Sequence, residues 1–201
     1  MLNITNRISL SRKSRAHIKS YKNRIGGSLK SNSWDKIRNS VKNEFSSKLF
    51  KSHGFKCVYC ERYLIGLNHQ MDHFAHKAQY PQFTFTPLNI FYSCGFCNST
   101  ERKGQNNTVV TLNNKYDKCI FLIVHPYFNN YNAEVIYHDA DRIYIDRNSC
   151  SVLGVNTIDF FRFDDDFYTL LRARTLLYER LNPLTSKQEK KLIQESISYN
   201  Y

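Results

Sequence analysis

Two short stretches, Cys57-Val-Tyr-Cys60 and Cys94-Gly-Phe-Cys97, decide how this chain folds. Each C-x-x-C pair presents two thiolates from one tight turn, and two such pairs supply the four sulfur ligands of a tetrahedral structural zinc. The segment between the pairs is rich in loop signals, so metal binding would supply much of the free energy that folds it. The spacing therefore predicts a structural Zn²⁺ ion held by Cys57, Cys60, Cys94 and Cys97. The alternative is four buried free thiols.

A second set of polar residues lies between and just after the cysteine pairs. Asp72 and His73 are adjacent, Asn89 follows, and Asn98 comes directly after the last cysteine. Carboxylate and amide oxygens suit an oxygen-loving divalent cation, and an imidazole suits the role of proton acceptor in hydrolysis. These residue types predict a second metal site that works in catalysis. Each of the four also has a structural interpretation, as a turn, packing or helix-capping residue.

The adjacency of Asp72 and His73 makes a prediction about the backbone. Neighbouring side chains point to opposite sides of an extended strand. We therefore expect the chain to turn or bulge at this point if both residues serve one site. His76, three residues further on, is expected either to position a phosphate or to have no task.

The net charge of +12 is confined to the first part of the chain. Residues 1–56 hold 14 Lys and Arg against 2 Asp and Glu, a balance of 14 − 2 = +12, whereas residues 57–201 hold 15 of each sign. A basic segment on a neutral body favours nucleic acid as a partner, through phosphate neutralisation and counterion release. The alternative is a solvated basic face. The contacts are expected from Lys13, Arg15, Lys19, Lys22 and Arg24.

The composition argues against several classes of protein. No run of about 18 apolar residues is present, so we expect no membrane partner. The first ten residues lack the apolar stretch of a signal peptide. Six cysteines, four of them in close pairs, are typical of a zinc site in a reducing compartment rather than of a disulfide framework. A cytoplasmic location is therefore expected.

Residues 1–54 are predicted to form a basic helical arm. One helix is expected at about residues 14–24, and a second from Trp34 to Lys51 with Ser33 as its cap. The second helix carries apolar residues at spacings of three and four, which would form one buried stripe. These residues are Trp34, Ile37, Val41, Phe45 and Leu49.

Residues 106–201 are predicted to form an α+β extension that packs on the metal segment, residues 55–105. Its elements are a buried strand at 120–124, a hairpin of 134–137 with 142–146, and a helix at 157–181 capped by Asn156. A capping box opens a last helix at about 186–196. The residues of helix 157–181 expected to face inward are Phe160, Phe163, Phe167, Leu170, Leu171 and Leu177.

In residues 55–105 the order of these motifs resembles the HNH endonucleases, the His-Me-finger or ββα-metal group. Their usual pattern is C-x-x-C, then D/E-H-I-x-P, then Asn, then C-x-x-C-[HN]-x-x-K. This chain has Asp72-His73-Phe74 in the second motif and His76 where the proline usually stands. Lys103-Gly104 lies further from Asn98 than the usual lysine does. We expect a short polar helix at 98–103 that ends at Gly104.

The resemblance implies a fold and a role for each motif residue. The fold is α+β: a zinc-stapled, treble-clef-like ββα-metal core, a basic helical N-terminal arm, and a C-terminal strand hairpin with helices. His73 would be the general base, and Asp72 and Asn98 would hold a catalytic Mg²⁺ or Mn²⁺ ion. Asn89 would orient the loop of His73 through hydrogen bonds. Lys103 is expected to join the nucleic-acid contacts.

More loosely, the chain resembles the HNH subunits of bacterial Septu- and retron-type anti-phage systems. The similarity includes the stretch after His73, the Val124-His-Pro-Tyr-Phe-Asn-Asn130 segment and Leu153-Gly-Val-Asn156. It implies a DNA endonuclease of anti-phage defence that works with an ATPase partner. Two other functions stay open: a non-catalytic zinc-stabilised module that binds nucleic acid, and a protein-interaction subunit in which the zinc turn is only a scaffold.

Overall fold

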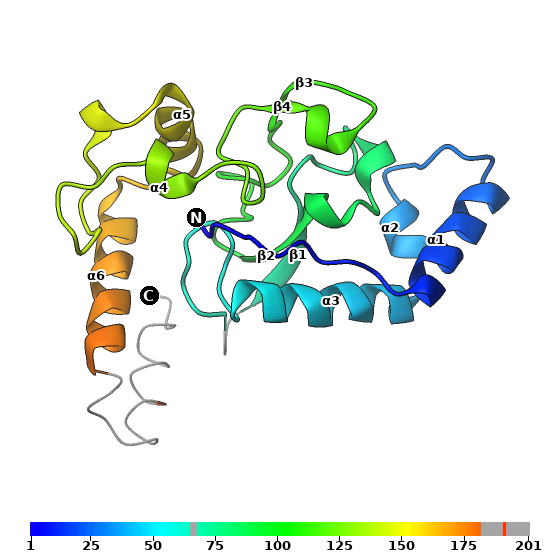
Figure 1. Cartoon of the computed structure of the whole chain (residues 1–201), viewed down its shortest axis with the longest axis horizontal. Helices are drawn as coiled ribbons and strands as arrows, with labels where there is room; N and C mark the ends of the chain where they lie inside the picture. The colour runs from blue at the N-terminus through cyan, green and yellow to red at the C-terminus, as the bar shows by residue number, and fades with distance from the viewer. Residues whose placement is uncertain (65–67, 182–190, 192–201) are drawn as a thin grey trace.

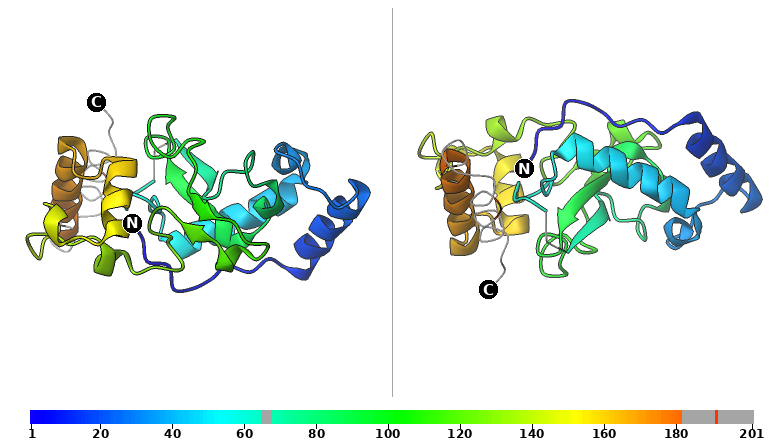
Figure 2. Two further views of the ribbon diagram at one scale, coloured as in Figure 1. Left: turned by 90° about the horizontal axis from the view of Figure 1, so that it is seen from above. Right: turned by 90° about the horizontal axis from the view of Figure 1, so that it is seen from below.

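A computed structural model describes residues 1–64, 68–181 and 191 of the chain (Figure 1). At its centre lies a two-stranded antiparallel sheet in which β1 (His69–His73) pairs with β2 (Ile90–Cys94). All five residues of β2 are buried, whereas β1 is exposed where it begins and buried where it ends. The helix α3 (Asn39–His53) runs alongside this sheet, as both views of Figure 2 show. The structure is therefore a mixed α/β fold with small sheets.

The first predicted helix is confirmed as α1 (Arg12–Arg24). The side chain of Ser11 caps its N-terminus by accepting a hydrogen bond from the backbone N–H of Ser14. The carboxylate of Glu44, on α3, accepts hydrogen bonds from the backbone N–H and the hydroxyl of Ser11 at 2.6 and 2.8 Å. These contacts attach the start of the basic helix to the body.

The single helix predicted from Trp34 to Lys51 is wrong. The chain forms α2 (Ser33–Lys36) and then α3, because Ile37 and Arg38 are extended, with ψ of 152° and 141°. The predicted stripe is nevertheless buried at all five positions. The break lets the ring of Trp34 turn so that it contacts the ring of His73 as well as that of Phe45, with centroid separations of 5.0 and 5.5 Å.

The first ten residues pack on the body instead of projecting as part of an arm. Met1, Ile4 and Leu10 are buried in the main hydrophobic cluster. The backbone N–H of Leu2 donates to the carbonyl of Val58 at 2.9 Å. The same cluster contains buried residues from 1–54, 55–105 and 106–201, so the three predicted segments share one core.

The segment after β2 and the second sheet differ from the predictions. Residues 95–105 form successive turns, and no regular helix lies at 98–103. The strand predicted at 120–124 is reduced to β4 (Ile120–Phe121), which pairs with β3 (Val109–Thr111). Ile120 and Leu122 are exposed, whereas Ile123 and Val124 are buried, because only one side of this small sheet faces the core. The described residues also form four 3₁₀ turns, two between β1 and β2 (Pro81–Phe83 and Pro87–Asn89) and two after β2, Tyr116–Lys118 (η3) and Arg147–Ser149.

The predicted hairpin of 134–137 with 142–146 is present only as a short antiparallel contact. It consists of one bridge between Tyr137 and Ile145, and Glu134 belongs to the helix α4 (Tyr131–Glu134). The cause is the N-cap at Asn130, whose side chain accepts from the N–H of Asn132 and starts a helical turn.

The helix predicted at 157–181 is two helices, α5 (Val152–Phe161) and α6 (Asp166–Leu181). Ser151, not Asn156, caps the first, and Arg162 ends it in a left-handed conformation with φ of 55°. This break changes which side chains face inward. Of the six predicted positions, Phe163 and Leu171 are buried, Phe160 is partly buried, and Phe167, Leu170 and Leu177 are exposed.

The helix predicted at about 186–196 lies outside the described residues, apart from Lys191. Among the described helices, none is both long and apolar enough to cross a membrane.

Gly154 is required by a close approach between α5 and α4. A Cβ atom at this position would lie 1.9 Å from the carbonyl oxygen of Glu134, and that oxygen also accepts the N–H of Ser151 at 3.0 Å. We expect Gly154→Ala to lower the free energy of unfolding by about 1–3 kcal/mol, measured by denaturant titration. Val152→Ala, at an exposed site of the same helix, is the control. Equal stability of the two variants would contradict this packing.

His53 predicts a pH dependence of stability. It is 3% exposed, and neither ring nitrogen has a hydrogen-bond partner among the described residues. Burial lowers the pKa of His53 to about 4. The unfolded chain, with a pKa of about 6.5, takes up the proton first, so this contribution to stability is present above that pH and is lost as the pH falls toward 4.

Replacing His53 by Leu should therefore reduce the loss of stability between pH 7.5 and 5.5 by about 1.4 kcal/mol, measured by chemical unfolding at each pH. His138→Leu, at an exposed site, is the control. If the wild type and His53→Leu lose the same stability over this range, His53 does not titrate on unfolding.

Candidate functional site

The two cysteine pairs lie on turns that the fold brings together. Cys57 and Cys60 belong to a turn in which the N–H of Cys57 donates to the carbonyl of Arg62 at 2.8 Å. Cys94 is the last residue of β2, and Cys97 lies in the turn that follows it. The antiparallel pairing of β1 with β2 therefore returns the chain to the first turn.

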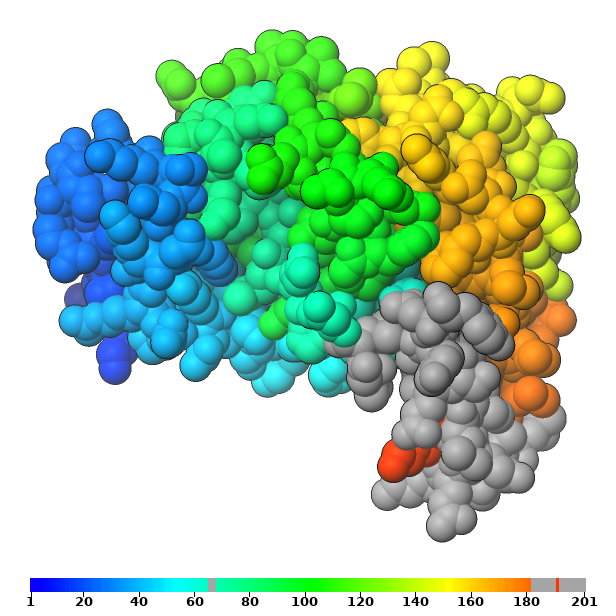
Figure 3. All heavy atoms as spheres, turned by 180° about the vertical axis from the view of Figure 1, so that it is seen from behind, coloured from blue at the N-terminus to red at the C-terminus, as the bar shows by residue number. Residues whose placement is uncertain are grey.

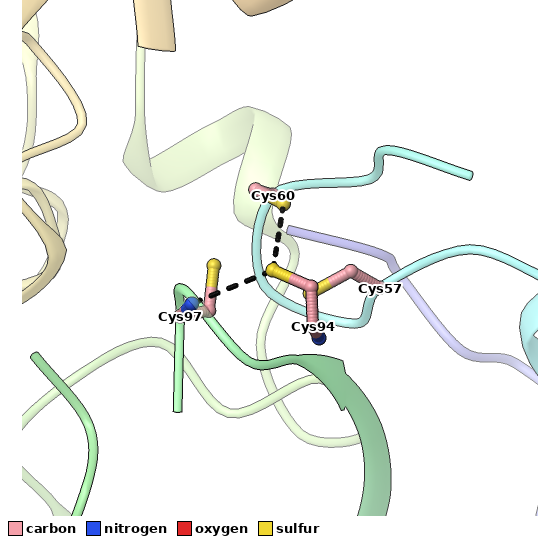
Figure 4. A group of neighbouring side chains, drawn as sticks. All are labelled: Cys57, Cys60, Cys94 and Cys97. Atoms are coloured by element: carbon pink, nitrogen blue, oxygen red, sulfur yellow. Dashed lines mark hydrogen bonds between the residues drawn. The ribbon is translucent and has the colours of Figure 1, made fainter. Parts of the chain in front are cut away.

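The four sulfur atoms form a cluster of the size that zinc requires (Figure 4). They lie within 4.8 Å of one another, and the sulfurs of Cys60 and Cys94 are 3.9 Å apart. A tetrahedral site with Zn–S bonds of about 2.3 Å has sulfur–sulfur edges of about 3.8 Å. The donor set and its dimensions therefore fit a structural zinc ion, as the sequence predicted.

The pKa values of the cysteine thiols also favour a bound cation at the cluster. Hydrogen bonds with the other three cysteines hold the pKa of Cys94 well below its usual range, whereas burial raises the pKa of Cys60 and of Cys97. Four thiols packed this closely therefore cannot all ionise alone, and a divalent cation would stabilise all four as thiolates. Burial works against the charge of Arg62, but the neighbouring cysteine sulfurs outweigh it and raise the pKa of its guanidinium.

The cluster also contacts α6. The hydroxyl of Tyr168, on α6, lies 3.2 Å from the sulfur of Cys97. The guanidinium of Arg102 stacks 3.7 Å from the ring centroid of Phe96 and donates to the carbonyl of Phe161 at 3.3 Å. A cation at the cysteines would therefore stabilise the packing of α6 as well as the two turns.

His73 is held at the end of β1 in one tautomer. It is buried, and its Nε2 lies 3.0 Å from the backbone carbonyl oxygen of Thr84, which can only accept. Nε2 therefore carries the proton, and Nδ1 keeps its lone pair. Burial lowers the pKa of His73 to about 4, so the ring is neutral at pH 7. A neutral imidazole with a free Nδ1 is able to take a proton.

Asn89 fastens the loop that follows His73. Its Oδ1 accepts from the N–H of Ala75 at 2.7 Å, and its Nδ2 donates to the carbonyls of Ala75 and Phe83 at 3.1 and 3.2 Å. The side chain is fully buried and does not line the pocket described below. These contacts fix the backbone at Ala75 and Phe83, and the orienting role in catalysis stays a prediction.

Asp72 is buried between a hydroxyl and an ammonium group. Its Oδ2 accepts from the hydroxyl of Tyr59, and its Oδ1 lies 3.6 Å from the Nζ of Lys103. That lysine is 0% exposed and donates to the backbone carbonyl of His73 at 3.1 Å. The nucleic-acid contact expected for Lys103 is therefore wrong: the side chain is an internal counter-ion that joins the second cysteine turn to β1.

A pocket of 260 Å³ brings several of the predicted residues together. Asp72, His73 and Asn98 all line it, with His76 and Lys77. Of the two expected possibilities, a turn or a bulge, the chain does not bulge, because β1 keeps a regular register with β2 through His73, but it bends directly after that residue. The pocket lies at the end of the strand, where both adjacent side chains reach it.

The oxygen donors of this pocket fit a divalent cation. The Nδ2 of Asn98 donates to Gln70 at 2.6 Å, and among the described residues neither the Oδ1 of Asn98 nor the Oδ1 of Asp72 has a hydrogen bond. One carboxylate and one amide oxygen are few ligands, but Mg²⁺ keeps several waters and binds substrate phosphates as well. The cation would share Asp72 with Lys103.

The basic residues predicted to bind nucleic acid all lie on α1. Four of the five side chains, Lys13, Arg15, Lys19 and Arg24, are exposed, and Lys22 is partly exposed. None forms an ion pair within the described part of the chain. Their charges are thus available to a polyanion.

Several residues that shape the site were not identified from the sequence. Thr84 fixes the tautomer of His73, Tyr59 binds Asp72, Gln70 orients Asn98, and Tyr168 contacts Cys97. Only the position of Tyr59 inside the first C-x-x-C pair could have drawn attention to it. The other three act through contacts between distant parts of the chain.

Comparison with known proteins gives one short similarity. A stretch of 68 residues is 37% identical to Protein ea31 of Escherichia phage lambda, and the match covers 34% of this chain. The chain spans only 22% of the length of that relative. No family model matches the chain.

The zinc site makes a prediction about stability. Cys60→Ser removes one thiolate, so we expect the purified variant to contain no bound zinc. Residues 55–105 should then no longer unfold in one cooperative transition, because the metal supplies their folding energy. Zinc content measured by elemental analysis and thermal unfolding test this. Cys150→Ser, outside the cluster, is the matched control. Normal zinc content and thermal stability in Cys60→Ser would show that the ligand set is wrong.

Proposed function

We propose that this protein is a metal-dependent endonuclease of the HNH type that hydrolyses phosphodiester bonds in DNA. The observation that carries the proposal is His73, a neutral imidazole with its proton fixed on Nε2, in a pocket that also holds the oxygens of Asp72 and Asn98. The exposed cations of α1 support a polyanionic substrate.

In the proposed reaction, Nδ1 of His73 removes a proton from a water molecule, and the resulting hydroxide attacks the phosphorus. The bond from phosphorus to the leaving oxygen breaks, and that oxygen takes a proton from solvent. Thr84 and Asn89 keep the imidazole and its loop in place throughout. Because burial lowers the pKa of His73 to about 4, the base needs no deprotonation of its own at neutral pH.

Asp72 and Asn98 would hold a Mg²⁺ or Mn²⁺ ion through their carboxylate and amide oxygens. Such an ion would neutralise charge on the scissile phosphate and on the leaving oxygen. Lys103 would keep the Asp72 carboxylate oriented toward the pocket and would not contact the substrate.

A non-catalytic zinc module would have no use for several of these contacts. Holding a buried histidine in one tautomer beside a buried Asp–Lys pair costs desolvation energy, which a purely structural core does not require. We therefore favour the endonuclease. A role in anti-phage defence and an ATPase partner stay predictions of the resemblance.

The decisive test is cleavage of supercoiled plasmid with Mg²⁺, Mn²⁺ or EDTA. We expect metal-dependent nicking that falls about 10²–10⁴-fold in His73→Ala, because the general base is lost. His138→Ala, at an exposed histidine, should cleave like the wild type. A folded, zinc-loaded His73→Ala protein with full activity would overturn the mechanism.

A further inference from the structure

A second concave site lies between α1 and α2. It has a volume of 410 Å³, and its lining includes Tyr21 and Arg24 from α1, Lys36 from α2, and Lys30 and Asn32 from the connecting loop. The guanidinium of Arg24 lies 5.5 Å from the ring centroid of Tyr21, which holds one cation at the wall. We call this concavity the α1–α2 pocket.

The α1–α2 pocket carries unbalanced positive charge. Arg24, Lys30 and Lys36 are exposed, and none forms an ion pair with an acidic side chain of the described residues. Glu44 and Asp35 are the only acidic residues before residue 57, and Glu44 is occupied by Ser11, Ser14 and Lys48. Three cations around one concave surface suit an anion with several acceptor oxygens, such as phosphate.

One contact links this pocket to the one that holds His73. Lys77 lines the His73 pocket, and its Nζ lies 3.3 and 3.4 Å from the two carboxylate oxygens of Asp35 on α2. Asp35 is followed directly by Lys36, a lining residue of the α1–α2 pocket. The two pockets are thus neighbours across a single ion pair. Figure 3 shows the blue surface of the N-terminal helices bordering the blue-green surface of the segment after β1.

We propose that the α1–α2 pocket binds a backbone phosphate of the same nucleic-acid strand whose scissile phosphate occupies the His73 pocket. This inference rests on the proposed function and extends it, because it assigns Lys30, Lys36 and Lys77 to substrate binding. A nucleic-acid strand is favoured as the occupant because it offers a phosphate at every nucleotide, so that one molecule satisfies two adjacent sites for phosphate.

The carboxylate of Asp35 is expected to weaken the binding of a nucleic-acid strand across the two pockets. Its side chain is 63% exposed and neutralises Lys77 at the boundary between the two pockets. A strand that crosses this boundary must pass an anion and compete with it for the lysine. Asp35 therefore limits affinity, and its removal should strengthen binding, a result that a merely structural ion pair would not produce.

The test is fluorescence anisotropy of a labelled oligonucleotide, single-stranded and as its duplex, with the full zinc-loaded chain in buffer without Mg²⁺ or Mn²⁺, over a range of salt concentrations. We expect Lys30→Gln with Lys36→Gln to weaken binding roughly tenfold. The slope of log K against log salt should become shallower by about 1.4 for a single strand or about 1.8 for a duplex. We expect Asp35→Asn to bind about threefold more tightly.

Matched controls lie on η3 and at Lys115 directly before it, where no residue lines the α1–α2 or His73 pocket. Lys115→Gln with Lys118→Gln removes two exposed cations there, and Asp117→Asn removes an exposed anion. Neither control should change the affinity by more than about twofold. Circular dichroism and zinc content confirm that each variant is folded.

Wild-type affinity and salt slope in Lys30→Gln with Lys36→Gln would overturn the proposal, as would wild-type affinity in Asp35→Asn. A larger effect of the double variant on binding of polyglutamate than on binding of either nucleic acid would also overturn it and assign the pocket to an acidic protein. Because these experiments measure binding without Mg²⁺ or Mn²⁺, they decide the assignment of the pocket separately from cleavage. A protein that binds as expected but cleaves no nucleic acid would contradict only the proposed nuclease.

Discussion

The four-cysteine cluster is the constraint on which the rest of the structure depends. It joins the turn of Cys57 and Cys60 to the end of β2 and to Tyr168 of α6. The local elements here are short: five-residue strands, isolated turns and two helices, α5 and α6, that are separated by the four residues 162–165. Such elements bury little area alone, so a metal ion at the sulfurs would hold together parts that are unstable separately.

The buried polar residues around β1 depend on the turns that the four-cysteine cluster joins. Lys103 follows the second cysteine pair, and its backbone N–H donates to the carbonyl of Cys97 at 3.1 Å. From that position the buried ammonium reaches both Asp72 and the carbonyl of His73. The cost of burying these charges is offset only if each has its partners, so the candidate site and the cysteine turn form one unit. His73 is fixed from the other side by Thr84 and by the ring of Trp34.

Charge is distributed so that the basic N-terminal region lies beside this site rather than apart from it. Residues 1–10 and α3 pack into the common core, and α1 is held by Glu44, so the cations form part of the body's surface. Asp35 is the one exposed carboxylate among the first 56 residues that stands between the α1–α2 pocket and the His73 pocket. The net charge of +12 thus lies on a packed surface beside the His73 pocket instead of on a separate tail.

The sequence by itself determined which four cysteines could hold a zinc ion, the buried stripe of residues 34–49 and the location of the positive charge, because each is a local pattern of spacing or composition. The five stripe positions, from Trp34 on α2 to Leu49 on α3, are buried as their periodicity predicts, although the helix breaks at Ile37. Only the tertiary structure decided the partners of His73 and Asp72 and the burial of Lys103. Those contacts join residues 11 to 31 positions apart, across turns whose geometry no local spacing encodes, and the cost of burying polar groups selects the pairs that satisfy one another.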